Sequence, residues 1–451
     1  MTAGTSRRTR WGVAVALITV AALLLIPGLV RGTGSRVDQG ERPAAFRADP
    51  NTPADGPIAA LQRRVGDNPR DFDAHIALAE AYLQRVRETG DPALYTKAAT
   101  LLDRAEQLDA QRAELFAARG RLALARHDFA EALKFGKRAL IVDPDDARYY
   151  GLLGDAQIEL GLYDEAIASY QAMVNHRPDF GSYSRVAHAR ELYGDPEGAI
   201  QALQFALNAG AAVPENTAWA YVQLGNLWFE TGHLDDAAKS YALALQTLEA
   251  YPPALAGQGR VAAARGDLAG AAALYGRAFD RMPVPEYAIL LGDVYAKQGD
   301  GHKAAEQYAL VRTIDTLFRA NGVNTDLELA LFFADHDLDL PASLAKARAA
   351  YGARPSIHAA DALAWTLYKT GNYQEAQQYA DTALKLGTRD ALKLFHAGMI
   401  AKALGQHERA RAYLQQAVDL NPHFSLLYSE RAADALKDLG TGPVATPAGG
   451  A

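Results

Sequence analysis

Hydrophobic and small residues recur at intervals of three and four positions along most of the 451-residue chain, with charged residues between them. This spacing predicts short amphipathic α-helices, because it places the apolar side chains on one face of each helix. Short clusters of glycine, aspartate, asparagine and proline separate the helices and predict turns. No segment has the pattern of a β-strand, so the sequence predicts an all-α protein.

The N-terminal segment Trp11–Val30 departs from this pattern, because all of its residues are uncharged. At about 1.5 Å per residue, a helix of this length spans the roughly 30 Å hydrocarbon core of a bilayer. Three arginines precede it, and this basic flank also fits a cleavable signal peptide. However, the apolar run is long for a signal peptide, and the residues after Val30 form a poor cleavage site. The segment is therefore predicted to be a single transmembrane helix that stays uncleaved.

The orientation of this anchor follows from the flanking charges. Arginines lie on both sides of the span, at Arg7, Arg8 and Arg10 before it and at Arg31, Arg36, Arg42 and Arg47 after it. The short N-terminal tail, with its free amine, favours a cytoplasmic N-terminus. We therefore expect a single-pass membrane protein with the bulk of the chain extracytoplasmic.

A six-residue motif recurs along the rest of the chain and reveals an internal repeat. Clear copies begin at Gly161, Gly232, Gly266, Gly371 and Gly405 and end on an alanine five residues later. This alanine is at Ala98, Ala132, Ala166, Ala199, Ala237, Ala271, Ala304, Ala376 and Ala410, and Ser343 takes its place in a degenerate copy. The sequence thus predicts ten units of about 34 residues.

Other positions of each unit agree with two short helices that cross closely. A small residue recurs twelve positions before the alanine, as at Gly154 and Gly225, and prolines such as Pro144 and Pro178 end units. With these residues, the segment 57–440 resembles the tetratricopeptide repeat (TPR) proteins. The resemblance implies a right-handed superhelical solenoid of about ten helix pairs, whose concave groove holds protein segments.

The resulting domain organisation has four parts. Residues 1–31 form the tail and signal anchor, 32–56 a flexible linker, 57–440 the TPR solenoid with a capping helix at Ser425–Leu439, and 441–451 a disordered tail. The motif is irregular in three places. The first helix of the first unit extends up to Asp91, an insertion lies at Asn208–Thr217, and the stretch Val311–Leu340 lacks the motif.

Composition and motifs argue against several function classes. The chain has 46 basic and 53 acidic residues, a net charge of −7, which disfavours nucleic-acid binding. It has no cysteine for disulfides, thiolate metal sites or nucleophilic catalysis. The motif Asp335–Asp339 resembles a calcium loop, but Leu340 and Lys346 replace the required glycine and glutamate, so a polar loop with aspartate caps is expected. We expect no cofactor, no metal and no enzymatic activity.

Histidine and aromatic residues also have non-catalytic interpretations. His127, His233, His302 and His407 lie in or beside turns and are expected to be solvated. The aromatic residues recur at helical spacing, which is typical of the core of stacked helices.

The residue after each recurring small residue is expected on the concave surface, by the geometry of the TPR family. In chain order these are Glu80, Arg121, Asp155, His188, Asn226, Arg260, Asp293, Phe332, Trp365 and Met399. The candidate partner groove is Arg121, Asp155, His188, Asn226, Arg260 and Asp293, with Trp365 as an apolar anchor. Packing against the C-terminal cap is the alternative role of the last three residues. The carboxylate clamp of some TPR domains is not reproduced.

The predicted function is a membrane-anchored protein–protein interaction scaffold that holds a peptide or helix of a partner. The alternative is an assembly factor or chaperone for a specific membrane or exported complex.

Overall fold

A computed structural model describes residues 55–440, and this range is all helical, with no β-strand. The predicted span Trp11–Val30, most of the linker and the tail 441–451 lie outside the described residues. Within residues 55–440, no helix combines the length and the apolar character needed to cross a membrane. The all-α prediction is therefore confirmed for the described part of the chain, and the anchor stays a prediction.

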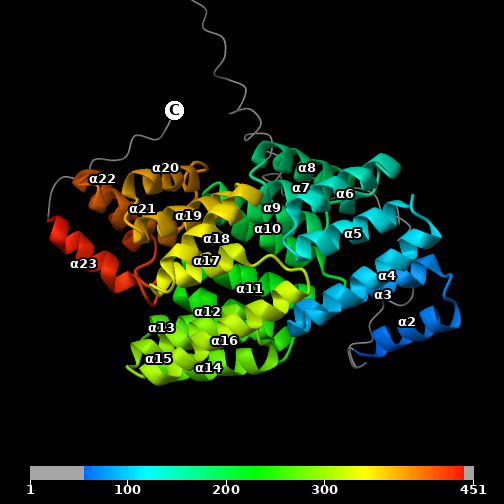
Figure 1. Cartoon of the computed structure of the whole chain (residues 1–451), viewed down its shortest axis with the longest axis horizontal. Helices are drawn as coiled ribbons and strands as arrows, with labels where there is room; N and C mark the ends of the chain where they lie inside the picture. Colours follow the sequence, from blue (N-terminus) through cyan, green and yellow to red (C-terminus); the bar gives the residue numbers. More distant parts are fainter. Residues whose placement is uncertain (1–54, 441–451) are drawn as a thin grey trace, which may run out of the picture. The chain divides into compact units, whose positions relative to one another are not determined.

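The helices α3 to α22 form ten consecutive hairpins, which we call units 1 to 10 (Figure 1). Their bounds are α3 (Phe72–Thr89) and α4 (Ala93–Leu108), α5 (Ala113–Ala125) and α6 (Phe129–Val142), α7 (Ala147–Glu159) and α8 (Tyr163–His176), α9 (Phe180–Leu192) and α10 (Pro196–Ala209), α11 (Pro214–Glu230) and α12 (Leu234–Thr247), α13 (Pro252–Ala264) and α14 (Leu268–Arg281), α15 (Pro285–Lys297) and α16 (Gly301–Ala320), α17 (Asp326–Asp335) and α18 (Leu340–Ala353), α19 (Ile357–Lys369) and α20 (Tyr373–Ala383), α21 (Ala391–Ala403) and α22 (His407–Leu420). The helix α2 (Asp55–Asp67) precedes them and α23 (Ser429–Leu439) follows them. The predicted ten helix pairs are thus present.

Side-chain caps and small residues explain why each unit folds as a hairpin. Aspartates at the turn accept backbone N–H groups of the second helix, as Asp128 does in α6 and Asp195 in α10. Where the helices cross, a Cβ atom at Gly154 would lie 2.4 Å from the Tyr170 ring. Ala166 is fully buried, whereas Ala168 is exposed. The predicted register of the repeat is therefore correct.

The irregular regions keep the hairpin but change its helix lengths. In unit 7, α16 has 20 residues, and the α17 helix that follows in unit 8 has only 10. In unit 5, α11 has 17 residues and begins at Pro214. The motif is lost at 311–340 because extra turns of α16 occupy sequence that forms loop and helix in other units.

Successive turns of the superhelix touch one another. The loop residue Asn324 donates its N–H to Arg126 O at 3.0 Å, Ile357 donates its N–H to the Tyr163 hydroxyl at 2.7 Å, and Asn421 donates through Nδ2 to Phe229 O at 2.7 Å. The last two pairs are 194 and 192 residues apart in the sequence. The turns inside units 2, 3 and 5 therefore dock on the loops that precede units 8 and 9 and α23.

A glycine makes one of these close contacts possible. Gly161 has a positive φ of 70°, and a Cβ atom there would lie 2.4 Å from Pro355 O. Only a residue without a side chain combines this backbone conformation with this approach. The turn glycines of some units thus allow close contact between superhelical turns, in addition to forming the local turn. The repeat pattern alone did not indicate this second role.

Candidate interaction groove

The first two polar residues of the predicted groove are held by ion pairs with neighbouring helices. Arg121 on α5 donates through Nε to Glu80 Oε1 on α3 at 2.8 Å. Asp155 on α7 accepts from Arg185 Nη2 on α9 at 2.6 Å and from the Tyr170 hydroxyl at 3.0 Å. Both pairs are partly exposed, so these side chains link the first helices of adjacent units while still reaching solvent.

The middle residues of the predicted groove are also accessible. His188 is 44% exposed, and its Nδ1 lies 3.6 Å from Glu191 Oε2. Asn226 accepts a hydrogen bond from the Tyr241 hydroxyl at 2.8 Å, and the Arg260 guanidinium lies 4.4 Å from the centre of the Phe229 ring. Arg260 makes no ion pair among the described residues.

Asp293 is less accessible than the sequence predicted. Its carboxylate is buried and accepts from the Tyr308 hydroxyl at 2.8 Å, with His336 Nε2 2.7 Å away. The pKa of His336 is raised: burial opposes the charged form, but the hydrogen bond to Asp293 and its charge outweigh this effect. The Asp293–His336 pair therefore stabilises the packing of α15 against α17.

Trp365 is core, which corrects the prediction of an exposed anchor. Its side chain has no exposed surface, and its Nε1 donates to Asp335 Oδ1 at 2.8 Å. The indole stacks on His396 with ring centres 4.2 Å apart, and Tyr428, just before α23, packs against its edge. Phe332 and Met399 are also buried. Trp365 and Met399 pack in one core cluster with the C-terminal cap, which is the alternative that the sequence had left open. Phe332 packs instead against Tyr308 and Phe333.

A cavity of about 440 Å³ lies where the polar part of the groove meets the next superhelical turn. Asp155 and His188, both predicted groove residues, line it. Glu159, Arg354 and Glu328 line it as well and were not predicted. Glu159 follows Asp155 by one helical turn and could have been found by that spacing. Glu328 on α17 and Arg354 at the end of α18 both come from unit 8 through the winding of the superhelix, which the repeat does not encode locally.

Arg354 connects carboxylates of two superhelical turns. Its Nη2 donates to Glu328 Oε1 at 3.1 Å, and its Nη1 lies 3.5 Å from Glu159 Oε2. The guanidinium also lies 5.3 Å from the centre of the Phe129 ring. Because the Arg354 side chain is only 9% exposed, this cation neutralises two acids in a site of limited hydration.

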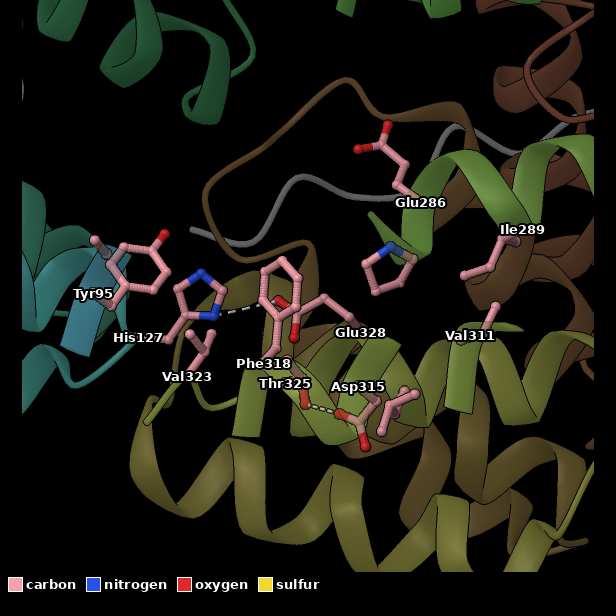
Figure 2. Close-up of a pocket in the computed structure, with 13 residues that line it drawn as sticks. Tyr95, His127, Glu286, Ile289, Val311, Asp315, Phe318, Val323, Thr325 and Glu328 are labelled. Atoms are coloured by element: carbon pink, nitrogen blue, oxygen red, sulfur yellow. Dashed lines mark hydrogen bonds and ion pairs between the residues drawn. The ribbon is translucent and has the colours of Figure 1, made fainter. Parts of the chain in front are cut away.

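His127 corrects the prediction of a solvated turn histidine. Its Nδ1 lies 2.8 Å from Asn324 O, across the contact between superhelical turns, and 3.8 Å from Glu328 Oε1. It lines the 440 Å³ cavity and a second cavity of about 190 Å³. The second cavity lies between α4 and α5 on one side and α15 to α17 on the other (Figure 2). The two cavities therefore adjoin at His127 and Glu328.

Charged groups of units 4, 5, 6, 9 and 10 shift one another's pKa values. Burial raises the pKa of Glu230 to about 8, with repulsion from Glu191 adding to the effect and Arg260 opposing it. Burial lowers the pKa of His358 to about 3, and the Lys393 charge adds to this. Both shifts have burial as their main cause, with smaller contributions from charges on neighbouring helices.

The remaining candidate chemistry is structural in the described residues. Asp339 caps α18 through Ala342 N, as expected for the motif Asp335–Asp339. Asp335, by contrast, is held by Trp365 and the Tyr428 hydroxyl. Within residues 55–440, no group of three histidine, aspartate or glutamate side chains is arranged to hold a metal ion.

Comparisons with known proteins agree with the repeat. One family described as tetratricopeptide repeat matches residues 123–191, and a second family with the same description matches residues 257–316 and 362–423. These segments coincide with helices of units 2 to 4, 6 to 7 and 9 to 10. The comparison with curated proteins gave no significant match.

Several solved structures resemble the chain. The human IFIT1 dimer with PPP-AAAA is 14% identical, with 81% of this chain and 87% of that chain covered and a TM-score of 0.45. The APC/C hetero-tetramer Cut9–Hcn1 is 14% identical, with 86% and 93% covered and a TM-score of 0.35. PilF of Pseudomonas aeruginosa is 20% identical, with 48% and 95% covered and a TM-score of 0.34.

The ten hairpins, their small residues at the helix crossing and the family matches lead to one conclusion: the chain contains tetratricopeptide repeats, arranged as an α-helical solenoid.

Proposed function

We propose that this protein is a membrane-anchored interaction scaffold that holds a segment of a partner protein inside its solenoid. TPR repeats suggest protein–protein interaction. One observation supports the more specific proposal that the partner is held inside the solenoid. The cavity of about 440 Å³ is lined by charged and titratable side chains of units 3, 4 and 8, including Asp155, His188 and Arg354. A solenoid needs no such partly hydrated charges for its own stability, because apolar contacts stabilise the stacking of its repeats.

The anchor in this proposal is Trp11–Val30, which the sequence favours and the described residues do not include. The bulk of the chain would then work beside the membrane, on the extracytoplasmic side. The proposed role is non-catalytic, and an acidic chain is a poor ligand for nucleic acid. A chaperone or assembly factor remains the second candidate, because transient holding of a client uses the same groove.

Two measurements test the proposal. The intact chain should fractionate with membranes and resist a high-salt wash, and a mature N-terminus near Ser35 would contradict the anchor. A membrane pull-down with quantified ratios should recover a partner that is lost in His188→Ala but kept in the exposed control Ala168→Ser. A fixed partner ratio supports the scaffold, whereas a substoichiometric set of clients supports the chaperone. Equal recovery with both variants would contradict binding in the interior.

A further inference from the structure

The second cavity, of about 190 Å³, combines an apolar interior with an acidic edge. Val311, Val323 and Leu329 form buried walls, and Ile289 and Phe318 form half-buried ones. For comparison, an apolar cavity of about 150 Å³ binds benzene. The cavity is therefore large enough for one leucine or phenylalanine side chain.

The edge of this cavity is acidic. Figure 2 shows Glu286 and Glu328 with the cavity lining, and Glu286 makes no hydrogen bond or ion pair among the described residues. Glu286 lies in the first turn of α15, where a negative charge is favourable. Asp315, the third acid, is already neutralised by Arg319 at 3.0 Å.

The adjoining 440 Å³ cavity extends the negative charge. Glu159 and Glu328 share Arg354, and Asp155 has its own partner in Arg185. Among the described residues, five carboxylates line the two cavities, and two of them, Asp155 and Asp315, are paired with arginines outside the lining. The other three, Glu159, Glu286 and Glu328, have one guanidinium in the lining, that of Arg354. Arg126 precedes the shared lining residue His127 in the sequence, but it lines neither cavity. The joined space has an excess of negative charge.

We infer that the joined cavities bind a basic, apolar peptide segment, with one bulky apolar side chain in the 190 Å³ cavity and an adjacent lysine or arginine at Glu286 and Glu328. The inference rests on the proposed function, because it names the chemistry of the partner that the groove holds. A peptide fits better than a small amine, since His127 and Glu328 line both cavities, so a ligand that occupies both must be extended.

The state of Glu286 supports this choice. Although the side chain contacts solvent, the surrounding protein raises its pKa, and Arg260 only partly offsets this effect. An ionised carboxylate without a partner in such a place gains from a bound cation. Binding should therefore weaken with added salt.

The test uses the full chain in zwitterionic nanodiscs, with empty nanodiscs as the blank. The probe is a fluorescent nonapeptide with one phenylalanine between two lysines in an alanine and glycine background. Its affinity should fall at least tenfold when the phenylalanine is replaced by alanine, and also when the lysines are replaced by glutamates. On the protein side, Glu286→Gln with Glu328→Gln should lower the affinity at least tenfold and flatten its salt dependence. The exposed control Glu249→Gln should not.

A second variant tests the apolar part without changing charge. Ala125 lines the 190 Å³ cavity and is half-buried, so Ala125→Leu fills it. This variant should lose peptide binding with its helical signal retained, whereas Ala168→Leu should bind normally. Binding that survives both Ala125→Leu and the double glutamine variant overturns this inference. If the natural partner found by pull-down is still lost in His188→Ala, the proposed function stands even though the inference about the peptide is wrong. If neither partner nor peptide binds the parent chain, the proposed function falls as well.

Discussion

The residue that follows the recurring small residue of each unit has different surroundings in two regions of the solenoid. In units 3 and 4 this position holds Asp155 and His188, which line the 440 Å³ cavity and are partly exposed. In units 8 to 10 it holds Phe332, Trp365 and Met399, all of which are buried. Phe332 is buried by packing against Tyr308 and Phe333. Trp365 and Met399 instead belong to a core cluster that is completed by the segment leading into α23. Its residues Phe424 and Tyr428 pack against Phe395, and the Tyr428 hydroxyl also donates to Asp335 Oδ1 at 2.8 Å.

This comparison shows what a repeat pattern encodes. The period defines which helix face points inward, because small and large residues set the register between helices. Whether that face is open depends on what covers it, and this depends on chain that lies elsewhere in the sequence. The change from polar to apolar residues along the groove therefore marks the boundary of the covered region.

The largest effect is expected for Trp365→Ala. This change removes a fully buried aromatic side chain and a hydrogen-bond donor to Asp335, so the free energy of unfolding should fall by about 3–5 kcal/mol. Because repeat arrays can unfold in parts, hydrogen exchange of α19, α21 and α23 should accompany the melting curve. His188→Ala, at the same repeat position, should change stability by less than about 1 kcal/mol. Similar losses in both variants would remove the distinction between the regions.

A smaller effect is expected where the superhelical turns touch. Gly161→Ala introduces a Cβ atom 2.4 Å from Pro355 O at a φ of 70°, so about 2–4 kcal/mol should be lost. The matched control is Gly371→Ala, which has a φ of 80° with no atom within 4 Å and should lose only about 1 kcal/mol. The difference in melting temperature measures the contact between turns. Equal losses would mean that the turns are not held together at Gly161.

How far the sequence predicts this structure can be seen in particular residues. Gly154 and Ala166 gave the helix pairs and their register, because the requirement for small residues at a crossing is local. Asp155 and His188 follow the small residue at the crossing, and both line the 440 Å³ cavity. Arg354 could not be found, because its neighbours Glu159 and Glu328 come together only through the superhelical winding.

His127 illustrates the same limit. A histidine in a turn normally faces water, and only the docking of Asn324 makes it part of an interior wall. The winding depends on small angles added over many units, so it is not readable from any single copy of the motif. The sequence therefore predicts the unit better than the site.

A pH-dependent effect of moderate size is expected in the interior. The pKa of Glu230 is about 8, above its ordinary value of 4.5, so its contribution to stability is lost as pH rises from 4.5 to 8. Glu230→Gln should thus stabilise the protein by about 1–2 kcal/mol at pH 8 and have little effect at pH 4.5. Melting curves of both proteins across this range measure the difference. If the difference in stability between Glu230→Gln and the parent protein does not grow with pH, Glu230 is better hydrated than this structure indicates. For the exposed control Glu249→Gln, the difference from the parent protein should not change with pH.

The smallest effect is expected for the ion pair of Arg121 with Glu80. Arg121 is 35% exposed and Glu80 22% exposed, so water screens their attraction. Arg121→Ala should lower the free energy of unfolding by less than about 1 kcal/mol, and by still less in 0.5 M salt. A double-mutant cycle with Glu80→Ala measures the pair itself, apart from other losses of each side chain. A coupling above about 2 kcal/mol would show that this polar position is a structural clamp like the buried Asp293–His336 pair. A small coupling would show that the pair contributes little to stability. If the Arg121→Ala variant also binds a partner more weakly, in a salt-dependent way, Arg121 belongs to the open part of the groove.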